Sequence, residues 1–118
     1  MTTAHNQTRN ITVAHSVETA DTYFSRLFGL MGRAGLPQGH GMWITPCADI
    51  HSFFMRFSFD ALFLSKTGEV LHSVSAMAPW RVSRWVRGSA GVLELPAGVI
   101  EKTQTQLGDH IIIEVSSS

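Results

Sequence analysis

The chain has 118 residues, of which 44% are hydrophobic and 15% are charged, and these values are typical of one globular domain. Nine basic residues balance nine acidic residues, which argues against binding to double-stranded nucleic acid or to an anionic membrane surface. The single cysteine, Cys47, excludes an internal disulfide. Because no apolar run is long enough to span a bilayer and residues 1–10 lack the apolar segment of a secretion signal, we expect a cytoplasmic protein.

The N-terminal part of the sequence predicts a disordered start, one strand and one helix. Residues 1–10 are polar and predict a disordered segment. Apolar and polar residues alternate from Ile11 to Val17, which predicts a half-buried strand. Apolar residues then recur every three or four positions, so we expect a helix over about residues 22–30 and no other substantial helix.

The rest of the chain reads as short strands separated by turns. The predicted strands are Met42–Thr45, Ile50–Met55, Phe59–Leu64, Glu69–Met77, Ser89–Leu95 and His110–Val115. Ala78–Gly88 is a long irregular loop, Val99–Gln106 is either a short helical turn or a strand, and 116–118 is a loose tail. This pattern predicts a mainly β single domain over residues 11–115, built as a two-layer sandwich or a flattened, partly open barrel.

Several motifs occur in a fixed order along the chain. They are Gly29-Leu30-Met31-Gly32-Arg33, His51-Ser52-Phe53-Phe54-Met55-Arg56-Phe57, Asp60, Leu93-Glu94-Leu95-Pro96-Ala97-Gly98 and Gly108-Asp109. From about Ile11 to Val115 the chain resembles the bacterial and archaeal domain-of-unknown-function family 192. The resemblance implies a compact, mainly β sandwich with one N-terminal helix. It implies no reaction, substrate or cofactor, and we expect no cofactor.

Cys47, Asp49 and His51 are candidate metal ligands. Alternate residues of a strand share one face, so these three side chains would converge if the segment is extended. Thiolate, carboxylate and imidazole are all common donors to transition metals. The alternative is structural: a buried thiol, a turn-forming aspartate and a hydrogen-bonded histidine.

His51 and Asp60 form a candidate catalytic pair. If the two segments that carry them pair, a carboxylate next to the imidazole would fix its tautomer and raise its pKa, as a general base requires. The alternative is that Asp60 accepts hydrogen bonds from backbone amides and holds the connection over residues 55–59.

The segment from Trp80 to Arg87 combines aromatic and basic side chains. No acidic residue occurs between Glu69 and Glu94, and the segment itself holds Trp80, Arg81, Arg84, Trp85 and Arg87. Arginine recognises carboxylate or phosphate groups, and tryptophan offers a flat face for stacking. These residues, together with His51, are the predicted ligand-binding residues. The alternative is that both tryptophans close an open end of the sandwich and the arginines are simply solvated.

Two further patterns predict ordinary structural roles. An apolar stripe is expected to be core rather than a ligand pocket: Phe53, Met55, Phe57, Phe59 and Phe63. Glu94, between Leu93 and Leu95, is expected to face outward or to pair with an arginine.

The sequence therefore favours a non-catalytic accessory module that binds a small ligand or a protein, with an anionic small molecule or an acidic protein surface as its partner. The alternative function is a metal-assisted, hydrolase-like enzyme that uses His51 and Asp60, with Cys47 as a possible third group.

Overall fold

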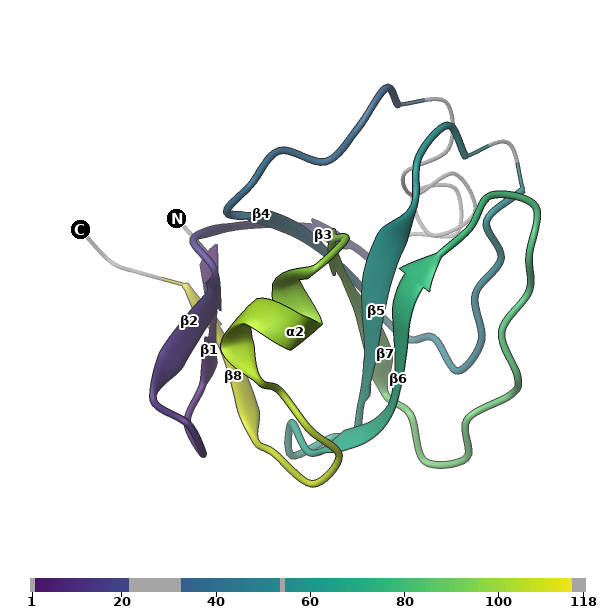
Figure 1. Cartoon of the computed structure of the whole chain (residues 1–118). Helices are drawn as coiled ribbons and strands as arrows, with labels where there is room; N and C mark the ends of the chain where they lie inside the picture. Colours follow the sequence, from purple (N-terminus) through teal and green to yellow (C-terminus); the bar gives the residue numbers. More distant parts are fainter. Residues whose placement is uncertain (1, 22–32, 54, 116–118) are drawn as a thin grey trace.

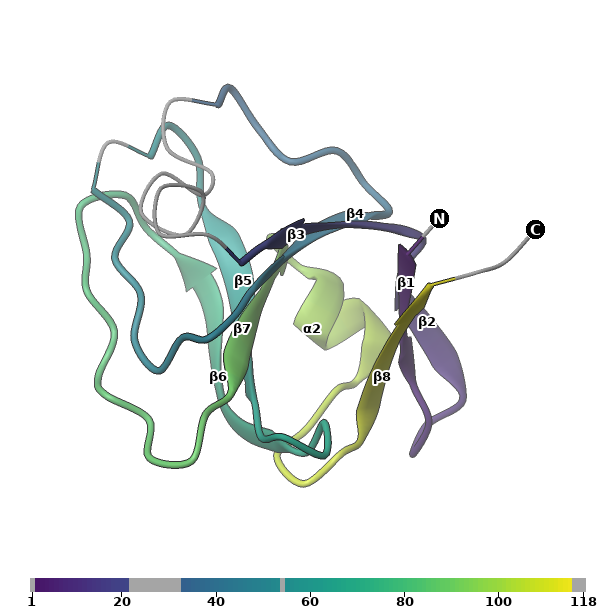
Figure 2. The same ribbon diagram turned by 180° about the vertical axis from the view of Figure 1, so that it is seen from behind.

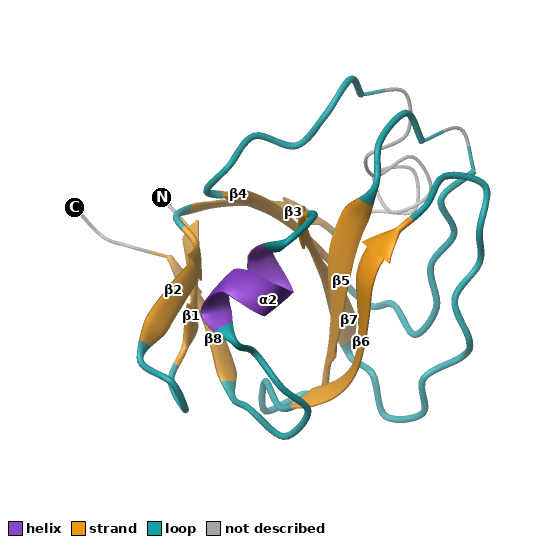
Figure 3. Cartoon of the chain, viewed as in Figure 1, coloured by secondary structure: helices purple, strands orange, loops and turns teal. Residues whose placement is uncertain are grey.

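The computed structural model describes residues 2–21, 33–53 and 55–115, and its fold is mainly β, as predicted (Figures 1 and 3). The strands are β1 Thr2–Asn6, β2 Ile11–Ala14, β3 Ser16–Ala20, β4 His40–Ile44, β5 Phe59–Leu64, β6 Val70–Met77, β7 Gly91–Pro96 and β8 Ile111–Val115. They form a three-stranded sheet of order β2-β1-β8 and a five-stranded sheet of order β3-β4-β7-β5-β6. Helix α2, Val99–Thr103, settles the open assignment of that segment. The helix predicted over residues 22–30 lies outside the described residues.

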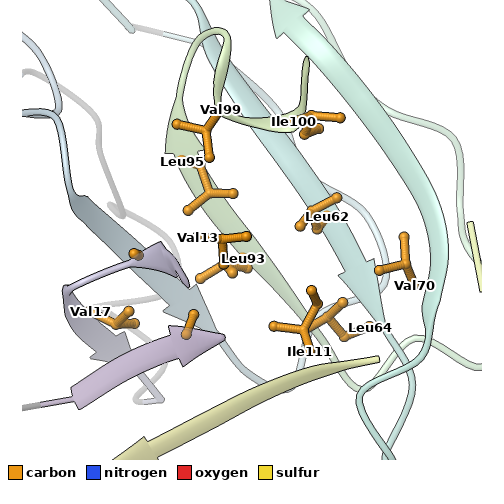
Figure 4. Close-up of a cluster of buried hydrophobic side chains, with 12 residues drawn as sticks. Val13, Val17, Leu62, Leu64, Val70, Leu93, Leu95, Val99, Ile100 and Ile111 are labelled. Carbon is orange, nitrogen blue, oxygen red and sulfur yellow. The ribbon is translucent and has the colours of Figure 1, made fainter. Parts of the chain in front are cut away.

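The main hydrophobic core fills the space between the two sheets. Figure 4 shows its side chains converging from both sheets and from α2. Its members are Ala4, Val13, Ala14, Val17, Leu62, Leu64, Val70, Leu93, Leu95, Val99, Ile100 and Ile111. Packing of aliphatic side chains therefore holds the two sheets and helix α2 together. No helix in the described part of the chain is long and apolar enough to cross a bilayer.

The five-stranded sheet is covered on both faces. Every residue of β5 and β7 is buried, a pattern typical of strands that lie at the centre of a sheet between two layers. The face away from the three-stranded sheet carries a second apolar cluster, which includes Met42, Phe59 and Phe63. Val86, in the loop between β6 and β7, is also buried in this cluster. Loops therefore form a third layer on the outer face of the larger sheet.

The predicted strand from Ile11 to Val17 is two strands in two different sheets. Ala14 of β2 pairs with Ala4 in the small sheet, whereas Ser16 of β3 pairs in parallel with His40 in the large sheet. The chain changes sheets at His15, whose amide hydrogen-bonds to the carbonyl of Gly39 at 2.7 Å. Such a change of sheet turns a corner of the sandwich, and it breaks the predicted alternation, since Ala14 is buried and His15 is exposed.

The sequence predicts a disordered N-terminus, but Thr2–Asn6 forms strand β1 at the centre of the small sheet. The polar residues there are hydrogen-bonded rather than solvated. Asn6 is fully buried, and its side-chain amide donates to Asp109 at 3.0 Å and to Thr105 at 3.2 Å. Arg9 pairs with Asp109 at 2.7 Å. Burial alone would raise the pKa of Asp109, but hydrogen bonds from Asn6, Gln106 and Arg9 hold it below its usual value.

The predicted strand Ile50–Met55 is wrong. Its ladder consists of one isolated bridge, between His51 and Val82. Isolated hydrogen bonds take the place of a regular ladder: the Ser83 amide donates to the Ile50 carbonyl at 2.8 Å, Ser83 Oγ accepts the Ile50 amide at 2.9 Å, and Ser52 Oγ donates to the Ala78 carbonyl at 2.6 Å. Side-chain bonds of this kind let an apolar segment satisfy its backbone without forming a regular strand.

Gly91 is required by the close approach of Trp43. A Cβ at position 91 would lie 2.5 Å from Cη2 of Trp43 and 2.8 Å from the Ile44 carbonyl oxygen. We therefore expect Gly91→Ala to lower the free energy of unfolding by about 1 to 3 kcal/mol through overpacking. Urea denaturation measures this loss, and Gly35→Ala is the matched control because a Cβ there would meet nothing within 4 Å. Equal stability of the two variants would show that the Trp43 ring moves away at no cost.

Candidate functional site

The predicted binding loop is attached to the segment around Ser52 by a dense set of hydrogen bonds. Ser52 is fully buried. Its amide donates to the Arg81 carbonyl, its carbonyl accepts from the Trp80 amide, and its hydroxyl accepts from the Arg81 amide, all at 2.8 to 2.9 Å. Figure 1 shows the two segments running together beside β6. Hydrogen bonds therefore fix the position of the loop against the rest of the domain.

The far half of the loop is anchored in the same way. Val86 is 2% exposed, and its amide donates to the Ala48 carbonyl at 2.8 Å. The Ser89 hydroxyl donates to the Cys47 carbonyl at 2.8 Å. These contacts fix both ends of the loop against the segment that precedes β5.

The aromatic side chains of this loop are exposed, which argues against their plugging an open end of the sandwich. Trp80 is 56% exposed and Trp85 is 69% exposed, with Val82 between them at 66%. The Trp80 ring contacts Phe53, with 5.8 Å between ring centroids, and Phe53 in turn contacts His51 at 5.0 Å. Trp80 also has a left-handed backbone, with φ of 64°. A bulky residue rarely adopts this conformation, which is found most often at functional positions.

The loop is also a patch of positive charge. Arg81, Arg84 and Arg87 are exposed, and none of them forms an ion pair with a residue that the structure describes. Burial lowers the pKa of His72, and the charge of Arg84 lowers it further. The guanidinium groups are therefore available to an anionic partner.

The structure does not assemble the candidate metal ligands. The thiol of Cys47 donates to the backbone carbonyl of Asp49 at 2.9 Å, and Nδ1 of His51 accepts from the Phe53 amide at 3.2 Å. Within residues 2–21, 33–53 and 55–115, no three His, Cys, Asp or Glu side chains are grouped to hold a metal ion. The segment is not a strand, so the alternation that would have aligned the three residues is lost.

Asp60 is occupied by backbone amides. Its side chain is fully buried and accepts the amide hydrogens of Ala76 at 2.8 Å, Gly98 at 3.1 Å and Ile100 at 2.9 Å. The last two belong to the start of α2, where a carboxylate is favoured. Ala76 has a left-handed backbone, with φ of 51°. No hydrogen bond in the described part of the chain joins Asp60 to His51, and the amides that Asp60 holds lie outside residues 55–59.

Most of the predicted apolar stripe is core. Phe59 and Phe63 are fully buried, Met55 is 6% exposed, and Phe57 packs partly buried against the outer cluster. Phe53 is the exception at 38% exposed. Its ring instead contacts the exposed ring of Trp80.

The expectation that Glu94 faces outward is wrong, and among the described residues no ion pair joins it to an arginine. Its neighbours Leu93 and Leu95 point into the core between the sheets, so Glu94 points to the other face of β7, where loops cover the sheet. It is 4% exposed, and its register partners on β4 and β5 are Met42 and Ala61, which are also buried.

The carboxyl group of Glu94 is incompletely paired. Among the residues that the structure describes, Oε2 has no hydrogen-bond partner. Burial raises the pKa of Glu94 to about 8, and the charge of Arg33 only partly opposes this rise. The Arg33 guanidinium pairs instead with Glu18 at 2.9 Å. At neutral pH Glu94 is therefore largely a neutral acid inside the protein.

Comparison with known proteins places this fold in a family. The family model DUF192, described as "Uncharacterized ACR", matches residues 3–113. The chain belongs to the DUF192 family. The UPF0127 protein of Thermococcus sibiricus is 34% identical over 115 residues, which cover 93% of this chain and 73% of that protein. A UPF0127 protein of Pyrococcus furiosus is 30% identical over 111 residues, covering 90% of this chain and 93% of the relative.

Two crystal structures share the DUF192 fold seen here. A protein of unknown function from Novosphingobium aromaticivorans superimposes with a TM-score of 0.81 at 19% identity, over 94% of this chain and 82% of that one. A putative transcription regulator from Sinorhizobium meliloti superimposes with a TM-score of 0.78 at 24% identity, over 95% and 91% of the two chains. At these identities the likeness concerns the fold and leaves the function of this DUF192 member to be argued from its own residues.

Proposed function

We propose that this protein is a non-catalytic binding module whose loop from Trp80 to Arg87, together with Phe53, contacts an acidic segment of a partner protein. The observation that carries the proposal is the combination of exposed tryptophans with exposed arginines that form no ion pair to a described residue, on a loop fixed by hydrogen bonds. Tryptophan and arginine are the residues most enriched among those that dominate binding energy at protein interfaces. A rigid loop also loses little conformational entropy when it binds.

The partner is inferred from exposure and charge. A small-molecule pocket buries most of its ligand among converging side chains, whereas Trp80, Val82 and Trp85 are each more than half exposed. Such side chains are better suited to a broad protein contact. The arginines select an acidic partner, and the aromatic rings favour one that also carries apolar side chains.

A labelled peptide of alternating glutamate and leucine provides the test, with fluorescence anisotropy as the readout. We expect Trp85→Ala to weaken binding by about tenfold or more, as for an interface hot spot. Arg84→Ala should weaken it by about two- to fivefold, and this loss should shrink as salt is added, because exposed charge pairs are screened.

The matched controls are Leu107→Ala, which removes a side chain that is 62% exposed elsewhere, and Lys102→Ala, which removes an exposed cation of α2. Both should bind as the unaltered protein does. Equal losses in the controls, or equal binding of a lysine and leucine peptide, would overturn the proposal.

A further inference from the structure

A separate cleft lies at one end of the sandwich, between the two sheets. It has a volume of about 440 Å³ and lies among β8, the turn that follows β5, and strands β3 and β4. Figure 2 shows β8 lying across from strands of the larger sheet. The volume is within the range of small-molecule sites, which tend to lie at the mouths of barrels and between layers.

The inner wall of the cleft is apolar and fixed. Leu64 and Ile111, which line it, are 1% and 2% exposed, and they lie together at one end of the core cluster in Figure 4. Trp43 forms another wall, and its indole ring lies directly on Gly91, where no Cβ intervenes. The apolar surface is therefore continuous with the core and does not need to rearrange to receive a ligand.

The lining of the cleft includes one cation, Lys66, and the hydroxyl groups of Thr2, Thr19, Ser65 and Thr67. Lys66 lines it and is exposed, and no acidic residue is among the lining residues. Ser65 Oγ accepts the amide hydrogens of Thr67 at 3.3 Å and Glu69 at 3.1 Å, and it lies 3.0 Å from Thr67 Oγ1. These bonds fix the backbone of the turn, while the long Lys66 side chain is free to reach a bound group.

One edge of β8 also faces this cleft. The Ile111 amide donates away from β1, to the Gly68 carbonyl at 2.9 Å, whereas the His110 carbonyl accepts from Gln7 on the opposite side. Backbone groups alternate along a strand, so those of Ile113 point the same way as those of Ile111. In the described part of the chain β8 is an edge strand with only β1 beside it. The Ile113 amide is thus a second donor near the rim.

We propose that this cleft binds a small amphipathic carboxylate, with its apolar body between Trp43 and Ile113 and its carboxylate at Lys66. The apolar wall supplies affinity for the chain or ring of the ligand. The lysine, the hydroxyl of Thr67 and the edge amide supply donors for the head group. A carboxylate is the complementary group because every charged or donor group at the rim favours an acceptor.

Decanoate is the probe, with decan-1-ol as its uncharged match, and backbone amide chemical shifts in NMR spectra of the whole chain are the readout. We expect saturable shifts at Lys66, Gly68 and Ile113. Lys66→Gln should weaken decanoate binding by about tenfold and leave decan-1-ol binding unchanged. Lys102→Gln is the matched control, because Lys102 is the other lysine of the chain and does not line this cleft.

A second variant tests whether decanoate occupies the cleft, and it changes no residue of the hydrophobic core. Thr19 lines the cleft but is exposed, so Thr19→Glu should fold normally and abolish decanoate binding by repulsion. The proposal is overturned if decanoate produces no saturable shifts at the cleft, if those shifts survive Thr19→Glu unchanged, or if Lys66→Gln and Lys102→Gln bind decanoate equally well.

Discussion

Replacing Glu94 by glutamine should make the protein more stable at about pH 9 by roughly 3 to 5 kcal/mol, while changing stability little at about pH 4. The reason is the burial of the Glu94 carboxyl, which raises its pKa from 4.5 to about 8. Glutamine keeps the size of the side chain and resembles the protonated acid, but it never acquires the charge. It therefore removes the cost of ionising a group inside the outer apolar cluster.

The same pKa fixes how stability varies with pH. Between about pH 4.5 and pH 8 the unfolded chain has released the Glu94 proton and the folded protein still holds it. Stability must therefore fall as pH rises through this window, and it becomes level above it. Below pH 4.5 both states are protonated and Glu94 contributes no pH dependence.

Urea denaturation at a series of pH values measures the effect. The unaltered protein should lose stability across this window in excess of the loss shown by Glu94→Gln. Glu114→Gln, at an exposed position of β8, should follow the unaltered protein. Parallel curves for the unaltered protein and Glu94→Gln would mean that Glu94 is charged in the folded state and has found a partner.

Asp60→Ala should lower the free energy of unfolding by about 3 to 5 kcal/mol. The substitution removes the shared acceptor of the amides of Ala76, Gly98 and Ile100. The Ile100 bond is buried and the other two are partly buried, so all three donors lose a partner that water only partly replaces. The left-handed backbone of Ala76 loses its support at the same time. Asp60→Asn keeps one acceptor oxygen, so we expect a smaller loss.

Thermal and urea unfolding of the three proteins measure this ordering. Asp49→Ala is the control, because Asp49 is exposed and only its backbone carbonyl accepts a described hydrogen bond. It should change stability by no more than about 0.5 kcal/mol. If Asp60→Ala unfolded like the unaltered protein, the three amides would be satisfied by water, and the carboxylate would be free for another role.

Sequence patterning predicts the strands whose local composition and flanking turns are sufficient to define them. β5, β6, β7 and β8 lie within two residues of their predicted bounds, because each contains several apolar residues and lies next to a turn that contains glycine, proline or aspartate. The segment from Ile50 to Met55 is also rich in apolar residues, but its backbone bonds to Trp80, Arg81 and Ser83. Those partners lie in a loop about thirty residues away, and no local pattern reports such a contact.

Local sequence composition predicts one part of the candidate site and not the others. The loop from Trp80 to Arg87 stood out by composition alone, and its exposure in the fold leaves the arginines accessible. The alternation of Glu94 with Leu93 and Leu95 predicts an outward face for Glu94, which the structure contradicts. A strand at the centre of a sheet that is covered on both faces has no solvent-facing side. The complete burial of β7 depends on its neighbours β4 and β5 and on the layers that cover them, so the sequence of β7 alone does not predict it. The cleft at Lys66 is lined by residues of β1, β3, β4, β5 with the turn that follows it, and β8, so no local sequence pattern predicts it.

The pairing of β1 with β8 has a consequence for the order of folding. Thr2 lies opposite Val115, and Asn6 lies opposite Ile111, so the smaller sheet joins segments roughly a hundred residues apart. Contacts of such long sequence range are slow to form, because the chain entropy must be lost before they are gained. During synthesis, β1 and β2 can pair early, but β1 gains its second partner, β8, only after nearly the whole domain has been synthesised. Until β8 emerges, the inner face of the larger sheet, with Leu62, Leu93 and Leu95, lacks the strand that completes its cover, and this interval is when the nascent chain is most exposed to aggregation.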